Sequence, residues 1–249
     1  VPMGTEEADK AIAGWLNQNT GGLLSEETGN IRTDGNDLLR LYNTIYYKSG
    51  WQDAFKSSQT KQDTFTAADG AVQTVDFMHR TESGGYRKGE GYTAASRPLN
   101  YGRMVFVLPD ESVTPESLLQ RQGFLAELTG DYNAAELVWS VPKFDVKSST
   151  ELNEVLQALG VTDAFDMTEA DFTPLTDNGA FLSSAMQAAR VKIDEEGVEA
   201  AAYTELVCAD SAMMEVPPTV EMDLDRPFLF VIFDYNNIPL FVGTVNALN

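Results

Sequence analysis

The chain has 249 residues, with 38 acidic against 17 basic side chains and a formal net charge of −21. This charge opposes binding to nucleic acid or insertion into anionic membranes, and no basic cluster offers an exception. The single cysteine, Cys208, excludes an internal disulfide and a multi-cysteine metal site. We therefore expect one domain with a sizeable core, acting without metal or cofactor, whose partner is another protein.

The N-terminal residues predict an amphipathic helix. Residues 1–20 lack the order of charged and apolar residues that marks a signal peptide, and the chain has no apolar run long enough for a transmembrane helix. Thr5 is the expected N-cap, and Asn19 to Gly22 the expected end. The face expected to be buried consists of Ala8, Ile12, Trp15 and Leu16.

The middle of the chain predicts strands and one more helix. The expected strands are residues 38–48, 74–78, 92–95, 103–108, 137–141 and 188–193. Ser148 and Glu151 form a capping-box pair, so a helix is expected to start at this pair and to stop at Gly160. The inward residues of this helix would be Leu152, Val155, Leu156 and Leu159.

The C-terminal segment is the most apolar. Residues 228–233 and 240–245 flank a turn at Asn236-Asn237, which predicts two paired strands in the middle of the core. Together the elements predict an α+β fold with mixed β-sheets and surrounding helices.

The sequence gives little support for a catalytic site. His79 is the only histidine, no nucleophile motif accompanies it, and we interpret it as a surface residue at a strand end. The glycines at 84–85 and 89–91 are interpreted as turns, without the loop and lysine of a phosphate site. Trp51 follows a strand and is interpreted as a core anchor rather than a binding aromatic. An enzyme is therefore the least supported class.

The segment from Asp194 to Cys208 has the pattern of a strand at a position typical of an exposed loop. From Val198 onward every second residue is uncharged, whereas the residues between them include Glu199 and Glu205. The alternative is a helix, because alanine favours helices, but Gly197, Val198 and Tyr203 do not. The alternation predicts a segment able to join a sheet.

These features resemble the serpins, a family of large protease inhibitors that act by loop insertion. The resemblance covers nearly the whole chain and rests on many short motifs. These are IAGWL at 12–16, NTGG at 19–22, YNTIYYKSGW at 42–51, MVFVLP at 104–109, VPKF at 141–144, LGVTDAF at 159–165, EEGVEAAA at 195–202, RPF at 226–228 and LFVG at 240–243.

The resemblance implies a single serpin domain over residues 1–249 with a mobile reactive-centre loop at about 195–216. A serine protease would cleave this loop and remain bound as a covalent acyl-enzyme, while the loop inserts between the strands at 38–48 and 181–193 of a metastable fold. The hinge and inserted residues would be Glu195, Glu196, Gly197, Val198, Glu199, Ala200, Ala201, Ala202 and Thr204.

The family spacing places the cleaved bond at Ser211-Ala212, with Asp210, Met213 and Met214 as alternatives because the following stretch to Pro217 is long. Small residues here suit elastase-like proteases, and the absence of a basic residue argues against an arginine-specific target. The resemblance assigns sheet opening to Asn43, Trp51 and Gln187. Gln187 stands where relatives often have histidine, and we expect it to face Asn43.

The resemblance begins at the helix F of the family, so we expect the N-terminal portion of the fold to be supplied by a preceding, cleaved or separate segment. The implied protein is a bacterial-type inhibitor, extracellular or at the cell surface. A non-inhibitory serpin-fold carrier or binding protein is the alternative. Bulky or charged hinge residues usually mark that class, and Ala200 to Ala202 argue against it.

Overall fold

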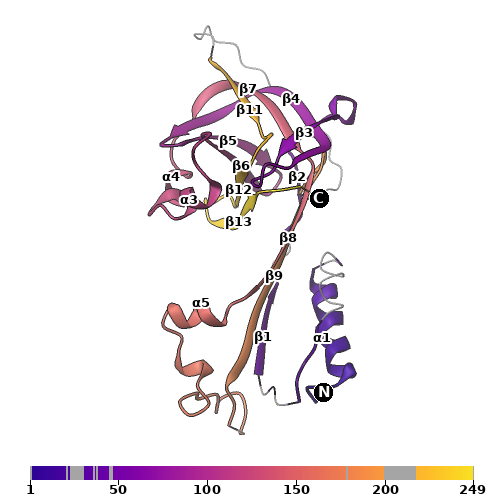
Figure 1. Cartoon of the computed structure of the whole chain (residues 1–249), viewed down its shortest axis with the longest axis vertical. Coiled ribbons are helices and arrows are strands. Elements are labelled where there is room, and N and C mark those ends of the chain that lie inside the picture. The colour runs from indigo at the N-terminus through magenta and orange to yellow at the C-terminus, as the bar shows by residue number, and fades with distance from the viewer. Residues whose placement is uncertain are drawn as a thin grey trace. The chain divides into compact units, whose positions relative to one another are not determined.

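The computed structural model describes residues 2–20, 22, 31–35, 37, 39–44, 47–177, 179–198 and 217–248. They fall into two compact units, one formed by residues 1–46 and 147–190 and the other by residues 47–146 and 191–249. Strands β8 (Phe144–Glu151) and β9 (Leu182–Ile193) contribute residues to both units (Figure 1). Each unit is described by itself below.

The first unit is built on the pairing of two parallel strands. Strand β1 (Leu39–Thr44) pairs directly with β9, from Leu39 opposite Leu182 to Thr44 opposite Ala188. Strand β8 also pairs with β9. The other elements are helix α1 (Glu6–Asn19), helix α5 (Asn153–Ala158) and the 3-10 turn η2 (Asp163–Phe165).

Helix α1 begins and ends as the sequence predicts. The Thr5 hydroxyl accepts a hydrogen bond from the amide of Ala8, and the helix ends at Asn19. Ala8 and Leu16 are buried, but the Trp15 side chain is 49% exposed within the described part of the chain. The predicted apolar face is therefore only partly covered.

The capping box predicted for the second helix is wrong. Ser148 and Glu151 lie in strand β8, and α5 begins only at Asn153, without a side-chain cap. Val155 and Leu159, predicted to face inward, are exposed. Pairing of residues 144–151 with β9 took priority over the local capping preference, because local propensity is weaker than tertiary pairing.

The second unit contains an eight-stranded sheet in the order β11-β7-β4-β5-β6-β12-β13, with β3 paired to β4 (Figure 1). Its strands are β3 (Lys61–Thr66), β4 (Val72–Gly89), β5 (Tyr92–Leu99), β6 (Gly102–Pro109), β7 (Asn133–Pro142), β11 (Thr219–Asp223), β12 (Phe228–Phe233) and β13 (Pro239–Val245). The short strands are β2 (Ser49–Gly50) and β10 (Gly197–Val198), and the helices are η1 (Ser57–Gln59), α3 (Pro115–Leu119) and α4 (Phe124–Glu127).

The core of this unit lies on both faces of β6 and β12. Leu118 and Phe124 from the helices pack with Val105, Val107 and Leu229 on one face. Trp139, Phe106 and Phe228 meet on the other face, with ring centroids about 6 Å apart. The predicted C-terminal strand pair is present, but only β12 is buried throughout. Strand β13 is half-exposed because it ends the sheet.

Two smaller predictions about β4 are corrected. Gly84 and Gly85 lie within this strand rather than in a turn, and a side chain on Gly84 would come within 2.5 Å of Leu137. Gly91 does form a turn, with a φ of 78°. His79 lies in the interior of the same strand, not at its end.

Candidate functional site

The described hinge residues form a tight turn held by one aspartate. The Asp194 carboxylate accepts hydrogen bonds from the amides of Glu196 (3.0 Å) and Gly197 (3.3 Å). The amide of Asp194 donates to the carbonyl of Gly197 at 3.1 Å. This turn reverses the chain at the end of β9.

After this turn, Val198 is already part of a sheet. It pairs with Ser49 on one side and with Ile193 on the other, antiparallel to both. Its side chain is 3% exposed. An inserted loop strand would need this orientation between two neighbouring strands.

Gly197 is required at the start of this pairing. Its φ is 149°, which side chains rarely adopt, and a Cβ atom would lie 2.5 Å from the Ser49 carbonyl oxygen and 2.6 Å from the Gly50 Cα. The two backbones therefore approach more closely than any other residue would permit.

The segment from Trp51 to Phe55 holds the carbonyls of the turn. The amides of Trp51 and Phe55 donate to the carbonyls of Glu196 and Glu195, both at 2.9 Å. The Trp51 indole nitrogen donates to the carbonyl of Asp194 at 3.0 Å. Trp51 is 4% exposed and is thus the core anchor that the sequence suggested. Its assigned role in sheet opening stays a prediction.

The Glu195 carboxylate connects the hinge to two other elements. The Lys143 ammonium lies 2.9 Å from its Oε2, and the Thr60 hydroxyl donates to Oε1 at 2.8 Å. Burial acts to raise the pKa of Glu195, but the hydrogen bonds from Lys143 and Thr60 outweigh it and hold the pKa below its ordinary value of 4.5. The hydrogen bond to Glu195 raises the pKa of Lys143 above 10.5.

We expect the Glu195–Lys143 pair to stabilise the fold in a defined pH window. A carboxylate with a lowered folded-state pKa stabilises above its ordinary value of 4.5, and an ammonium with a raised pKa stabilises below 10.5. Substitution of Glu195→Gln should lower the free energy of unfolding by about 1 kcal/mol near pH 7, a modest loss because solvent screens the partly exposed lysine. The difference from wild type should disappear as the pH falls through the folded-state pKa of Glu195.

Chemical denaturation between pH 3 and pH 9 measures this effect. Lys143→Met should cause a similar loss near neutral pH, and the double variant should lose little more than either single variant. A loss from Glu195→Gln that is the same at pH 3 as at pH 7 would contradict the assignment.

The other predicted sheet-opening residues lie in the first unit. Asn43 and Gln187 are direct partners in the ladder between β1 and β9, so the structure places Gln187 opposite Asn43. The strands between which insertion is expected are therefore hydrogen-bonded to one another in the part of the chain that is described.

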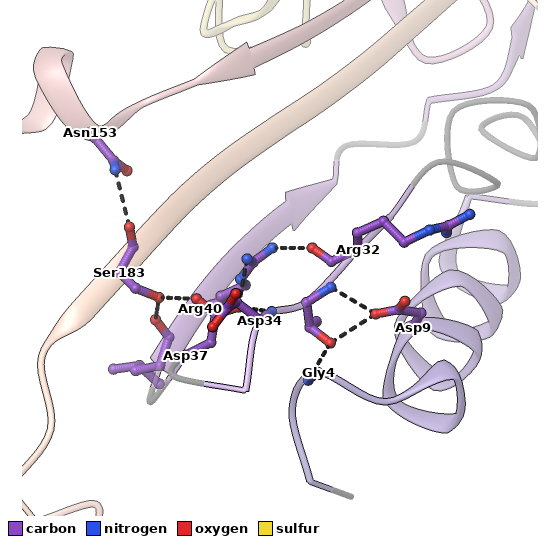
Figure 2. A network of polar contacts seen from close by, with 10 residues as sticks. Gly4, Asp9, Arg32, Asp34, Asp37, Arg40, Asn153 and Ser183 are labelled. Carbon is purple, nitrogen blue, oxygen red and sulfur yellow. Dashed lines mark hydrogen bonds and ion pairs between the residues drawn. The ribbon is translucent and has the colours of Figure 1, made fainter.

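A polar network fixes the beginning of these two strands (Figure 2). The Ser183 hydroxyl donates to the Asp37 carboxylate at 3.0 Å, and Asp37 pairs with Arg40 at 2.5 Å. Asn153 donates to the carbonyl of Ser183 at 3.2 Å. The Asp9 carboxylate of α1 accepts two hydrogen bonds from Thr33, both 2.8 Å. The network therefore links residues at the start of the β1–β9 ladder to α1 and α5.

Several predicted site residues lie outside the described residues. These are Glu199, Ala200, Ala201, Ala202, Thr204, Asp210, Ser211, Ala212, Met213 and Met214. The structure therefore describes the hinge as far as Val198 and not the inserted segment or the cleaved bond.

His79 does not form a hydrolytic triad in the described part of the chain. Its Nε2 lies 3.5 Å from the Ser140 hydroxyl, and its Nδ1 lies 3.2 Å from the backbone carbonyl of Gln59. A catalytic histidine would need a carboxylate on this second nitrogen. No group of metal-ligating side chains occurs among the described residues either.

Sequence reasoning missed three supports of the hinge: Lys143, Thr60 and the Ser49-Gly50 strand. Lys143 and Ser49-Gly50 lie within motifs that carried the resemblance, but residues far apart in sequence give no local signal that they meet. Only their long-range contacts identify them.

Comparisons with known proteins identify the family of this chain. The family model described as Serpin (serine protease inhibitor) matches residues 3–248. Human Serpin B11 is 31% identical over 251 residues, covering 96% of this chain and 63% of the relative. Serpin-Z1C of Triticum aestivum is 30% identical, covering 98% of this chain and 65% of the relative. The chain thus spans slightly less than two-thirds of these relatives.

Solved structures give the same fold. The thermophilic serpin tengpin in its native state has a TM-score of 0.83 and 28% identity, with 98% of this chain and 64% of tengpin covered. Human thyroxine-binding globulin complexed with thyroxine has a TM-score of 0.81 and 25% identity, with coverage of 99% and 66%. The chain belongs to the serpin family and has the α+β fold of that family. No described helix is long and apolar enough to cross a membrane.

Proposed function

We propose that this chain is the reactive part of a suicide-type inhibitor of serine proteases rather than an enzyme. The observation that carries the proposal is the two-sided pairing of Val198 between Ser49 and Ile193. The segment that follows Val198 has one uncharged face, which a strand inserted in a sheet requires. Membership of the serpin family gives the same expectation.

The proposed reaction begins with cleavage of the bond between Ser211 and Ala212. The protease serine attacks the Ser211 carbonyl, its proton passes to the leaving amine of Ala212, and an ester joins Ser211 to the protease. Residues 198–211 then enter the sheet as a strand about 46 Å long, carrying the bound protease with them. Water must be kept from the ester until insertion is complete.

The target is proposed to be elastase-like, because Ser211 and Ala212 suit a shallow specificity pocket. Asp210, Met213 and Met214 are the alternative cleavage positions, and a methionine would suit chymotrypsin-like enzymes. This target would place the inhibitor outside the cell or at its surface.

A non-inhibitory binding protein is the second candidate. A cavity of about 670 Å³ in the second unit, bordered in part by Arg97, Arg103 and Tyr132, is large enough for a small ligand. Thyroxine-binding globulin shows that the fold also occurs with a bound small molecule. The small residues Ala200 to Ala202 favour inhibition.

Incubation with elastase-like and trypsin-like proteases separates these functions. We expect a covalent complex with the elastase-like enzyme that survives a denaturing gel, with mass spectrometry locating the new N-terminus at Ala212. The cleaved protein should also unfold at a markedly higher temperature than the intact protein, because the inserted strand adds hydrogen bonds and buried surface. Cleavage without a complex and without added heat resistance would support the binding protein instead.

A further inference from the structure

Arg97 is a buried cation beside the hinge. It lies in β5, and its side chain is 1% exposed. Burial of a charge is costly unless other groups compensate it, so each contact of this guanidinium is informative. Its pKa is lowered by burial, while Glu82 acts in the opposite direction.

The polar contacts of Arg97 reach two elements. Its Nε donates to the Glu82 carboxylate at 3.0 Å, and its Nη2 donates to the backbone carbonyl of Asp53 at 2.5 Å. Glu82 also pairs with Arg80 at 2.6 Å. Glu82 would therefore keep a cationic partner if Arg97 were replaced by an apolar residue.

The guanidinium also lies over two aromatic rings. Its central carbon lies 3.8 Å from the ring centroid of Phe55 and 4.7 Å from that of Trp51. The two rings contact one another edge to face, with centroids 5.9 Å apart. Such cation–π contacts are strongest where water is excluded, as it is here.

Arg97 thus contacts Trp51, Asp53 and Phe55, which span the segment that holds the hinge. Trp51 and Phe55 supply all three hydrogen bonds to the carbonyls of Asp194, Glu195 and Glu196 described above. We propose that Arg97 is a positioning residue that fixes the 51–55 segment against the hinge, so that loop insertion starts from a defined geometry. We call the contacts of Arg97 with residues 51–55 the Arg97 clamp. The consequence for insertion depends on the proposed inhibitory function, but the clamp itself does not.

The geometry requires arginine rather than any cation. A guanidinium spreads its charge over three nitrogens, so it can lie against aromatic rings while its N–H groups donate to Glu82 and to the Asp53 carbonyl. A lysine ammonium is a compact charge and cannot make both sets of contacts in this arrangement. Arg97→Lys should therefore keep only part of the stabilising contacts that Arg97→Met loses.

Amide hydrogen exchange tests the clamp directly. In Arg97→Met, the amides of Trp51 and Phe55 should exchange about tenfold faster or more, whereas those of β12 should change little. Arg97→Lys should lie between this variant and wild type, and it serves as the test if the methionine variant does not fold. The matched control is Arg103→Met, since Arg103 also lies over two rings, those of Tyr132 and Phe233, but donates its hydrogen bonds to Leu128 and Asn237 instead of the 51–55 segment.

Equal acceleration at Trp51, Phe55 and the β12 amides would overturn the proposal, because it would show a general loss of stability. So would an unchanged exchange rate at Trp51 and Phe55. The share of protease encounters that end in a covalent complex should also fall in Arg97→Met relative to Arg103→Met. A third outcome is faster exchange at Trp51 and Phe55 in Arg97→Met, with no covalent complex formed by any variant or by the wild type. This outcome would support the positioning role of Arg97 and refute only the inhibitory function.

Discussion

Substitution of Ala202→Glu is expected to convert the proposed inhibitor into a substrate of its protease. Ala202 belongs to the uncharged face of the segment that follows Val198, and this face must become buried when the loop enters the sheet. Burial of an unpaired carboxylate costs several kcal/mol, so insertion would slow while hydrolysis of the acyl-enzyme continues at its own rate. The covalent complex should fall from the main product to a trace, as measured on a denaturing gel.

The matched control is Ala201→Glu, in which the same carboxylate is placed one residue earlier, on the face that already carries Glu199 and Glu205. This variant should keep most of the yield of complex, because a carboxylate on that face stays in water. Ala200→Glu should behave like Ala202→Glu. Equal yields from Ala201→Glu and Ala202→Glu would show that the alternation has no role in insertion.

The second large effect is expected from Gly197→Ala. The methyl group would overlap the Ser49 carbonyl and the Gly50 Cα, and it would also strain a backbone with a φ of 149°. The neighbouring atoms are backbone and cannot move aside at little cost, so we expect a loss of about 2–4 kcal/mol in the free energy of unfolding. Faster exchange at the amide of Trp51 should accompany this loss, since Trp51 binds the adjacent carbonyl of Glu196.

Gly70→Ala is the control for this substitution. Gly70 has a φ of 85°, but nothing lies within 4 Å of the added methyl group, so only the backbone strain of about 1–2 kcal/mol applies. The difference between the two variants therefore measures the close approach of the hinge to Ser49 and Gly50. If Gly197→Ala lowers the free energy of unfolding no more than Gly70→Ala does, the hinge backbone can move away from Ser49 and Gly50 at little cost.

Much of the fold could be predicted where a strong local pattern and the tertiary packing agree. The apolar run at 228–233 and the Thr5 cap before α1 are examples, because burial and capping act within a few residues. The capping box predicted at Ser148 and Glu151 failed because pairing with a distant strand fixed residues 144–151 as β8, so helix α5 begins only at Asn153. The exposure of β13 also depends on its place at the end of the sheet, which its own sequence does not encode.

The sequence predicts the hinge segment of the candidate site but not the distant residues that support it. The alternation and the motif at 195–202 mark the candidate hinge, because they are properties of consecutive residues. Its supports come from positions 49, 60, 97 and 143, and a single sequence contains no signal that joins them. Arg97 was missed for a further reason, since a lone arginine in a strand predicts an exposed side chain.

The position of Val198 has a kinetic consequence for the proposed insertion of the loop. A strand that enters a sheet usually has to form its first pairing against the entropy of an unrestrained chain, and this is the slow step. Val198 is already paired on both sides, so in the proposed mechanism growth of the new strand would start from an existing nucleus and add one pair after another. The rate at which the protease is captured should then depend mainly on how fast successive residues of the loop pair with the sheet. The time that the cleaved end needs for its first contact with the sheet should matter far less.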